Sequence, residues 1–213
     1  MTDSEQSLRA QIVVLGKSLF DRGYGVGSSG NISVRLDDGS ILVTPTNTSM
    51  GRLDPERIAK VAPDGGHVSG DKPSKEGFLH LAVYARRPEM KAVVHLHSTY
   101  SVALSTLAAQ DPEAMLPPIT AYYVMRVGAL PLVPYFPPGD RGLADAVGEA
   151  METAHAVLLA NHGSVVAGKS LEEAVYGAEE LEETAKLFFL LRGESTKFLS
   201  FAEVAELRAR FPS

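Results

Sequence analysis

Two histidines separated by one residue stand at the end of a short apolar run, AVVHLH, which begins at Ala92. Such a run is typical of a β-strand, in which alternate side chains share a face, so His95 and His97 are expected on one face and Leu96 on the other. Two imidazoles placed in this way can converge on one cation. An isolated His-x-His pair is about as often only two polar residues at a strand end, so other residues must decide between the two readings.

A third histidine and a glutamate extend this candidate site. His162 stands between two apolar runs and is followed by Gly163, which permits a tight turn at the edge of a sheet. If those runs are strands beside the one that carries His95 and His97, three imidazoles and an open position match a catalytic zinc site. Glu76 lies near the start of a predicted helix, where the helix dipole alone also favours an acidic residue.

Three short segments rich in hydroxyl groups and glycine form a second candidate group. Backbone N–H groups near glycine, hydroxyls and a helix N-terminus can all bind an anion. Each segment alone is more often an ordinary turn or cap, but together with a metal they suggest a phosphorylated substrate. The residues concerned are Ser28, Ser29, Gly30, Asn31, Thr44, Thr46, Asn47 and Ser74, and Lys75 follows the last of them.

Helices and hairpin-linked strands must position these residues. Apolar periodicity predicts helices over 4–22, 54–60, 75–87 with Ser74 as N-cap, 98–109, 140–151, 170–191 and 200–210. Strands are predicted over 32–36, 41–44, 60–62, 67–69, 92–97, 122–125, 130–133, 156–160 and 164–167. Because the order is not strictly βαβ, an α/β fold with a largely antiparallel sheet covered by helices is expected.

Two further expectations concern individual side chains on the predicted helices. The Glu-rich face of the helix over 170–191 is interpreted as solvated surface. His80 is expected to pack locally, one helical turn after Glu76, while His67 and His155 are interpreted as surface or structural residues.

The composition sets outer limits on the function. A chain of 213 residues with 45% apolar and 22% charged residues predicts one soluble domain over 1–213. No apolar run reaches membrane-spanning length and the start, MTDSEQS, does not resemble a signal peptide, so a cytoplasmic protein with no membrane partner is predicted. Without cysteine, a metal site must use nitrogen and oxygen. A net charge of −6 opposes nucleic-acid binding but allows a small anionic substrate.

Five separated motifs resemble those of the class II aldolase/adducin-head family. They are SSGNIS from Ser28, TPT from Thr44, PSKE from Pro73, VHLH from Val94 and NHG from Asn161. The resemblance implies a three-layer α/β/α fold with a mostly antiparallel central sheet. It also implies one divalent metal ion per subunit, Zn²⁺ or another, held by His95, His97 and His162, with Glu76 as ligand and acid/base residue.

The same resemblance implies a homotetramer with active sites between subunits. The sequence adds modest support, because the apolar, proline-rich segment from Leu116 to Pro138 carries Tyr122, Tyr123, Tyr135 and Phe136. This is more aromatic surface than one loop usually buries alone.

Within the family, the chain is similar to the 3-oxo-tetronate 4-phosphate decarboxylases over 70–76, 95–99, 124–126, 131–135 and 179–187. This similarity implies metal-dependent loss of CO₂ from 3-oxo-tetronate 4-phosphate, giving dihydroxyacetone phosphate through an enediolate in four-carbon acid sugar catabolism. The alternatives are a sugar-phosphate aldolase of the fuculose-phosphate type or an epimerase, and more distantly an adducin-like interaction domain.

Two further residue types are implicated by the resemblance. Fuculose-phosphate aldolases usually carry a serine where this chain has Lys75, so Lys75 is a candidate to orient the substrate carboxylate or to contact phosphate. The family's catalytic tyrosine corresponds to Tyr122 or Tyr123, and the sequence leaves both open.

Overall fold

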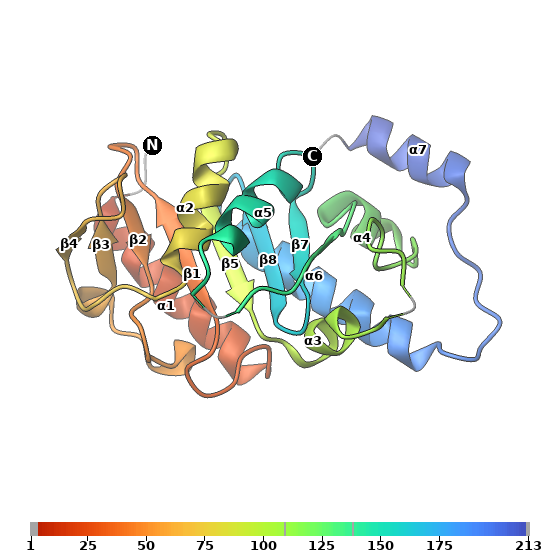
Figure 1. The fold of residues 1–213 in the computed structure, drawn as a ribbon, viewed down its shortest axis with the longest axis horizontal. Helices are drawn as coiled ribbons and strands as arrows, with labels where there is room; N and C mark the ends of the chain where they lie inside the picture. The colour runs from red at the N-terminus through yellow and green to blue at the C-terminus, as the bar shows by residue number, and fades with distance from the viewer. Residues whose placement is uncertain (1–3, 109, 138, 212–213) are drawn as a thin grey trace.

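A single mixed sheet organises the computed structural model, which describes residues 4–108, 110–137 and 139–211. Within these residues eight strands lie in the order β4-β3-β2-β1-β5-β8-β7-β6 (Figure 1). Neighbouring strands are antiparallel except for β6 and β7, which are parallel. The strands are β1 (Asn31–Arg35), β2 (Ile41–Val43), β3 (Ala59–Val61), β4 (His67–Ser69), β5 (Ala92–Leu96), β6 (Leu132–Val133), β7 (Ala156–Leu159) and β8 (Gly163–Gly168).

Helices cover both faces of the sheet (Figure 1). Adjacent residues of β5 point to opposite faces, so Val94 packs with α1 and α6 whereas Val93 packs with α2 and α5. This arrangement confirms the predicted three-layer α/β/α fold with a mostly antiparallel sheet. The helices are α1 (Glu5–Asp21), α2 (Gly77–Arg86), α3 (Thr99–Ser105), α4 (Ala121–Arg126), α5 (Gly142–Ala150), α6 (Leu171–Leu190) and α7 (Phe201–Arg210), with 3₁₀ turns at Met50–Arg52 and Pro55–Arg57.

The predicted strand over 122–125 is wrong, because these residues belong to α4. Thr120 begins the helix: its hydroxyl oxygen accepts the backbone N–H of Tyr123 at 3.0 Å. The helix then packs between α6 and α7, so tertiary contacts outweigh the β-propensity of its two tyrosines and its valine.

Three predicted helix boundaries also need correction. Residues 54–60 form only the short turn Pro55–Arg57 before the chain enters β3. The N-cap of α2 is Glu76 rather than Ser74, whose hydroxyl oxygen instead accepts the N–H of Glu76 at 3.3 Å. The helix predicted over 98–109 ends at Ser105, and its last predicted residue lies outside the described residues.

The acidic face of α6 was predicted to be solvated surface, but the structure buries one of its glutamates. Glu182 is 3% exposed and accepts hydrogen bonds from the backbone N–H groups of Tyr100 and Ser101, each at 2.8 Å. The Ser101 hydroxyl donates a third bond at 2.7 Å. The carboxylate therefore satisfies the free N–H groups at the start of α3, the helix that follows His97 directly after Ser98.

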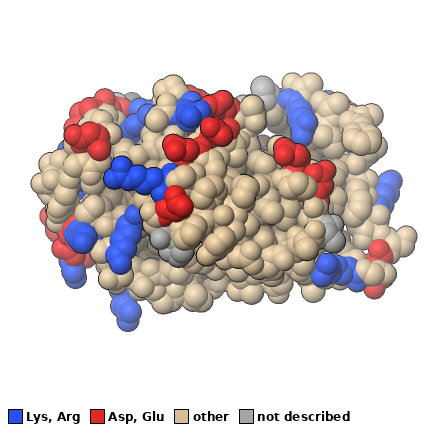
Figure 2. All heavy atoms as spheres, viewed as in Figure 1, with Lys and Arg blue, Asp and Glu red and all other residues tan. Residues whose placement is uncertain are grey.

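The charged side chains visible in Figure 2 are of both signs and stand in small groups, and no continuous basic area covers this face. Among the described residues, no helix is both long enough and apolar enough to cross a membrane.

Candidate metal centre

The histidine pair stands at the centre of the sheet. β5 lies between β1 and β8, and His95 is opposite Asn31 on one side and Val165 on the other. His95 is fully buried, and its Nδ1 lies 2.8 Å from the carbonyl oxygen of Ser164. Since a carbonyl can only accept, Nδ1 carries the proton and Nε2 keeps its lone pair free for a cation.

A close backbone approach brings His162 to the end of β5. A Cβ atom on Gly163 would lie 2.2 Å from the carbonyl oxygen of Leu96, so only glycine fits there. Asn161, on the other side of His162, adopts a left-handed backbone conformation with φ of 57°. These two residues turn the chain between β7 and β8 so that the His162 ring faces the histidine pair.

Four side chains meet at this point. One potential ligand atom from each of Glu76, His95, His97 and His162 lies within 4.8 Å of all the others. The Nε2 atoms of His95 and His97 are 2.9 Å apart. One Glu76 oxygen, Oε2, lies 3.4 Å from Nε2 of His95, and the other, Oε1, lies 3.2 Å from Nε2 of His162. The sequence prediction named all four residues, and the fold brings all four together.

The protonation states of these groups suit a cation. Burial alone would raise the pKa of Glu76, but hydrogen bonds and charge attraction from His162 and His95 outweigh it and hold the pKa well below its usual value. Burial, helped by the charges of His95 and His162, lowers the pKa of His97 to about 4. At neutral pH the cluster therefore offers the Glu76 carboxylate and a neutral His97 ring, and the hydrogen bond at Nδ1 of His95 leaves its Nε2 as a further donor atom. Such a nitrogen and oxygen donor set fits Zn²⁺ or a similar divalent ion.

Backbone hydrogen bonds place two of the hydroxyl-rich segments side by side. The carbonyl oxygen of Thr44 accepts the N–H of Ser74 at 3.1 Å, and the N–H of Thr46 donates to the carbonyl oxygen of Lys72 at 2.9 Å. The Thr44 hydroxyl oxygen accepts the N–H of Ile32 at 3.1 Å, which joins this pair to the start of β1. The two segments thus lie next to the strand that carries Asn31.

The glycine-rich segment leads directly into β1. The Ser29 hydroxyl donates to the carbonyl oxygen of Val26 at 2.7 Å, while Ser28 is exposed. Gly30 has φ of 79°, and a Cβ there would lie 2.9 Å from the carbonyl oxygen of His95. Asn47, in the neighbouring segment, is exposed with φ of 56°. Gly30 and Thr44 therefore lie at the end of β1 nearest to His95, and the other candidate residues of these two segments are their neighbours along the chain.

Lys75 and the two tyrosines lie in different surroundings. Lys75 is exposed and lines a cavity of about 600 Å³ together with Ser74 and Arg141. Tyr122 is 60% exposed and lines another hollow, whereas Tyr123 is 2% exposed. Burial raises the pKa of Tyr123, so its hydroxyl remains protonated.

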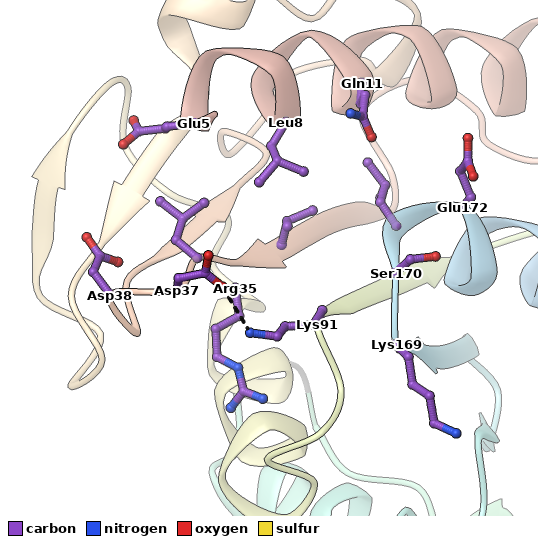
Figure 3. Close-up of a pocket in the computed structure, with 13 residues that line it drawn as sticks. Glu5, Leu8, Gln11, Arg35, Asp37, Asp38, Lys91, Lys169, Ser170 and Glu172 are labelled. Carbon is purple, nitrogen blue, oxygen red and sulfur yellow. Dashed lines mark hydrogen bonds and ion pairs between the residues drawn. The ribbon is translucent and has the colours of Figure 1, made fainter. Parts of the chain in front are cut away.

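A further pocket, of about 550 Å³, lies away from the histidines, between α1, the end of β1 and the start of α6 (Figure 3). Its charges are mixed, and Lys91 pairs with Asp37 at 3.4 Å. None of the four cluster residues lines this pocket. Although this pocket is large, it lacks the metal-binding side chains and is therefore not the site of metal chemistry.

The sequence interpretation missed the polar surroundings of Glu76. Asn31 donates from Nδ2 to Glu76 Oε2 at 2.8 Å, and its Oδ1 lies 2.5 Å from Nε2 of His80. His80 is therefore more than a local packing residue, and burial, with the charge of His95, lowers its pKa to about 3. The sequence contained one signal for this contact: the four-residue spacing from Glu76 to His80 places both side chains on one helix face.

Comparison with known proteins agrees with the five motifs. A family model described as the class II aldolase and adducin N-terminal domain matches residues 10–189. The 3-oxo-tetronate 4-phosphate decarboxylase of Escherichia coli (strain K12) is 53% identical over 205 residues, which cover 96% of this chain and 97% of that protein. The L-fuculose phosphate aldolase of Methanococcus maripaludis is 38% identical over 181 residues, 85% of this chain and 96% of the aldolase.

A solved structure extends the agreement to three dimensions. YgbL from Escherichia coli, described as an aldolase, epimerase or decarboxylase, matches with a TM-score of 0.94 and 52% identity over 96% of this chain and 99% of that one. The predicted similarity to the decarboxylases is thus confirmed. Because the family model spans most of the chain and close relatives span nearly all of it, the chain belongs to the class II aldolase and adducin N-terminal domain family.

Proposed function

We propose that this protein converts 3-oxo-tetronate 4-phosphate to dihydroxyacetone phosphate and CO₂, as a metal-dependent carbon–carbon lyase of four-carbon acid sugar catabolism. The observation that carries the proposal is 53% identity over 96% of the chain to a protein that bears this name. The fuculose phosphate aldolase is more distant, at 38% over 85% of the chain. The cluster of Glu76, His95, His97 and His162 supports a reaction that depends on a divalent ion.

The substrate carries a carboxylate at C1, a hydroxyl at C2 and a ketone at C3. Decarboxylation breaks the C1–C2 bond and leaves its electron pair on C2, delocalised into the C3 carbonyl, and a proton added to C2 completes dihydroxyacetone phosphate. A divalent ion bound by the cluster, with Zn²⁺ as our first choice, would supply a Lewis acid for the negative charge that develops on oxygen. His95, His97 and His162 would hold the ion through their ring nitrogens.

Glu76 is assigned as a fourth ligand, because its carboxylate faces two imidazoles and is ionised at neutral pH. It is also assigned as a proton carrier, which would take up a proton from solvent before passing it to C2. Lys75 is assigned to the substrate carboxylate, because it is an exposed cation that directly precedes Glu76 in the chain. It lines a cavity without any cluster residue, so the assignment rests on sequence adjacency and on the resemblance to the decarboxylases. Of the two tyrosines we choose Tyr122, since the hydroxyl of Tyr123 is buried. Tyr122 lines a hollow without any cluster residue, so it would serve the site of a neighbouring copy.

The substrate phosphate is assigned to the hydroxyl-rich segments. Neutral donors next to the metal cluster suit a protein of net charge −6. Soaked sulfate or phosphate should appear there in a crystal, and anions found only at Arg86 and Arg87 would contradict the assignment. The candidate donors are Ser28, Ser29, Gly30, Asn31, Thr44, Thr46, Asn47 and Ser74.

We further propose that residues 1–213 form one domain of a cytoplasmic homotetramer. Several large apolar side chains are exposed, among them Tyr122 at 60%, Tyr135 at 63% and Phe201 at 98%. Such surface is typical of a face that another subunit covers. Light scattering at micromolar concentration should give four chains per particle, and a monomer would contradict both the assembly and a shared active site.

The reaction is tested directly by supplying the oxo acid without any aldehyde. Product is followed with a reductase that consumes dihydroxyacetone phosphate, while released CO₂ is trapped in parallel, and chelator-treated protein measures spontaneous loss. We expect equal amounts of both products with the metal-loaded protein alone. No enzyme-dependent CO₂, together with dihydroxyacetone phosphate and an aldehyde from a longer sugar phosphate, would move the protein to the aldolase reading.

Lys75→Ser separates the two readings further, because it introduces the residue that aldolases of the fuculose-phosphate type usually carry. We expect decarboxylation to fall at least tenfold, since a cation that pairs with the reacting carboxylate is lost. Any residual aldol cleavage should change less. Equal decarboxylation by the variant and the parent would remove Lys75 from the reaction.

A further inference from the structure

Beneath Glu76, buried polar side chains form a continuous row, which we call the buried polar row: Asn31, His80, Ser33 and Tyr84. His80 Nε2 lies 2.5 Å from Asn31 Oδ1, and His80 Nδ1 lies 2.7 Å from the Ser33 hydroxyl oxygen. Ser33 in turn lies 2.8 Å from the Tyr84 hydroxyl. All four residues are at most 4% exposed, so water does not separate these groups.

The row is made by matching spacings on two elements. Asn31 and Ser33 are two residues apart on β1, which places them on one face about 6.8 Å apart. Glu76, His80 and Tyr84 follow one another at intervals of four along α2, about 6 Å per interval. The nearly equal steps let side chains from the helix and the strand alternate, so that each strand residue bridges two helix residues.

The carboxylate at one end sets the direction of every hydrogen bond. Ionised Glu76 can only accept, so Asn31 turns its Nδ2 to Glu76 and its Oδ1 to His80. His80 must then donate from Nε2, which leaves Nδ1 to accept from the Ser33 hydroxyl. Ser33 oxygen accepts from Tyr84 in its turn. A neutral imidazole with its proton on Nε2 satisfies the whole row, and the low pKa of His80 agrees with this state.

We propose that His80 is a positioning residue for the metal centre. By donating to Asn31 Oδ1 it fixes the amide with Nδ2 on Glu76 Oε2, and this keeps the other oxygen, Oε1, turned towards His162. Asn31 thereby commits one of its two Nδ2 hydrogens to the carboxylate. The inference rests on the metal site of the proposed function, and it is independent of which substrate is used.

A purely structural role explains less of this arrangement. Apolar side chains of the same size would fill the space between α2 and β1 without needing any partner, and such replacements are often neutral or stabilising. The polar groups do what apolar groups could not: the row ends on the Glu76 carboxylate and restricts the orientation of that carboxylate. Groups that orient a ligand in this way commonly change metal affinity 10–100-fold when they are removed.

The test measures binding of Co²⁺, whose visible absorption reports ligand geometry, to purified metal-depleted protein. His80→Leu removes the donor, and His80→Gln keeps an N–H that can reach Asn31. We expect His80→Leu to weaken Co²⁺ binding at least tenfold and to alter the absorption bands, with His80→Gln within about threefold of the parent. The matched control is Val83→Ala, a buried residue of the same helix that is outside the row. It should lower the urea midpoint and leave Co²⁺ affinity unchanged.

The outcomes separate this inference from the proposed function. A folded His80→Leu protein with parental Co²⁺ affinity and spectrum would overturn the positioning role while leaving the metal site intact. If the parent itself bound no Co²⁺ at the histidines, both would fail. Co²⁺ binding that depends on His80, without CO₂ release from the oxo acid, would refute only the proposed reaction.

A second variant covers the case in which His80→Leu does not fold. Asn31→Ala removes the last hydrogen bond to Glu76 and leaves His80 in place. We expect the same loss of at least tenfold in Co²⁺ affinity, and parental affinity in this variant would equally overturn the inference.

Discussion

Replacing Glu182 by Gln should destabilise the fold and loosen the segment that carries His97. The carboxylate of Glu182 accepts three hydrogen bonds at the start of α3, two from backbone N–H groups of Tyr100 and Ser101 and one from the Ser101 hydroxyl. Gln keeps one carbonyl oxygen and turns an NH₂ group towards donors that then lack an acceptor. The side chain is 3% exposed, so water cannot replace the lost bonds.

The expected loss follows from the number and type of these bonds. Hydrogen bonds to a charged group contribute about 1.5–3 kcal/mol each, and Gln should lose between one and two of the three, a total of roughly 1.5–6 kcal/mol. For a protein of this length each kcal/mol lowers the midpoint of thermal unfolding by about 2–4 °C. The midpoint for Glu182→Gln should therefore fall by roughly 3–24 °C.

The measurement is urea and thermal unfolding of metal-depleted protein at one fixed protein concentration, because assembly and metal both change apparent stability. The control is Glu183→Gln, one position further along α6, where the side chain is exposed. The control should cost less than about 1 kcal/mol. A free energy of unfolding for Glu182→Gln within about 0.5 kcal/mol of the parent would refute the reasoning.

Three further predictions concern pH, metal and the tyrosines. Folding lowers the pKa of His80 from 6.5 to about 3, so the unfolded chain takes up the proton first. The free energy of unfolding should therefore fall by up to about 1.4 kcal/mol per pH unit as the pH drops from 6.5 towards 4. Urea unfolding of His80→Gln should depend less steeply on pH. The charged groups that face the His80 ring are Glu76 and His95. Zn²⁺ at 100 times its dissociation constant should raise the free energy of unfolding by about 2.7 kcal/mol, and a chelator should remove that gain and the activity, as urea titrations and the CO₂ assay would show. Tyr122→Phe should lower turnover at least tenfold in steady-state kinetics while Tyr123→Phe changes it less than twofold, and the reverse order would exchange their roles.

Much of the candidate site was predictable because its signals are local. The His-x-His pair at a strand end and the glycine after His162 depend on periodicity and backbone geometry, which a sequence displays directly. The same reasoning failed for residues 122–125, since packing of α4 against α6 and α7 decides their conformation. The acidic face of α6 was misread for a related reason: Glu182 finds its donors on α3, about 80 residues earlier, and helical periodicity does not report such a partner.

The buried polar row shows a further limit of sequence reasoning. Asn31 looked like part of a glycine-rich anion loop, and His80 like an ordinary helix residue. Their contact depends on how β1 and α2 are placed against each other, which neither segment specifies alone. The four-residue spacing of Glu76, His80 and Tyr84 was visible, but its meaning depended on the partner strand.

The order of strands in the sheet has a consequence for how the chain folds. β5 joins an early group of strands, β1 to β4, to a late group, β6 to β8, and His95 lies opposite Val165, 70 residues further along. Contacts between such distant residues form slowly, because a long loop must close first. During synthesis, Glu76, His95 and His97 emerge well before His162, so an incomplete chain offers a cation only part of the cluster. We therefore expect the metal ion to bind late in folding, after β5 and β8 have paired, and to stabilise these paired strands. It should not form the nucleus from which folding begins.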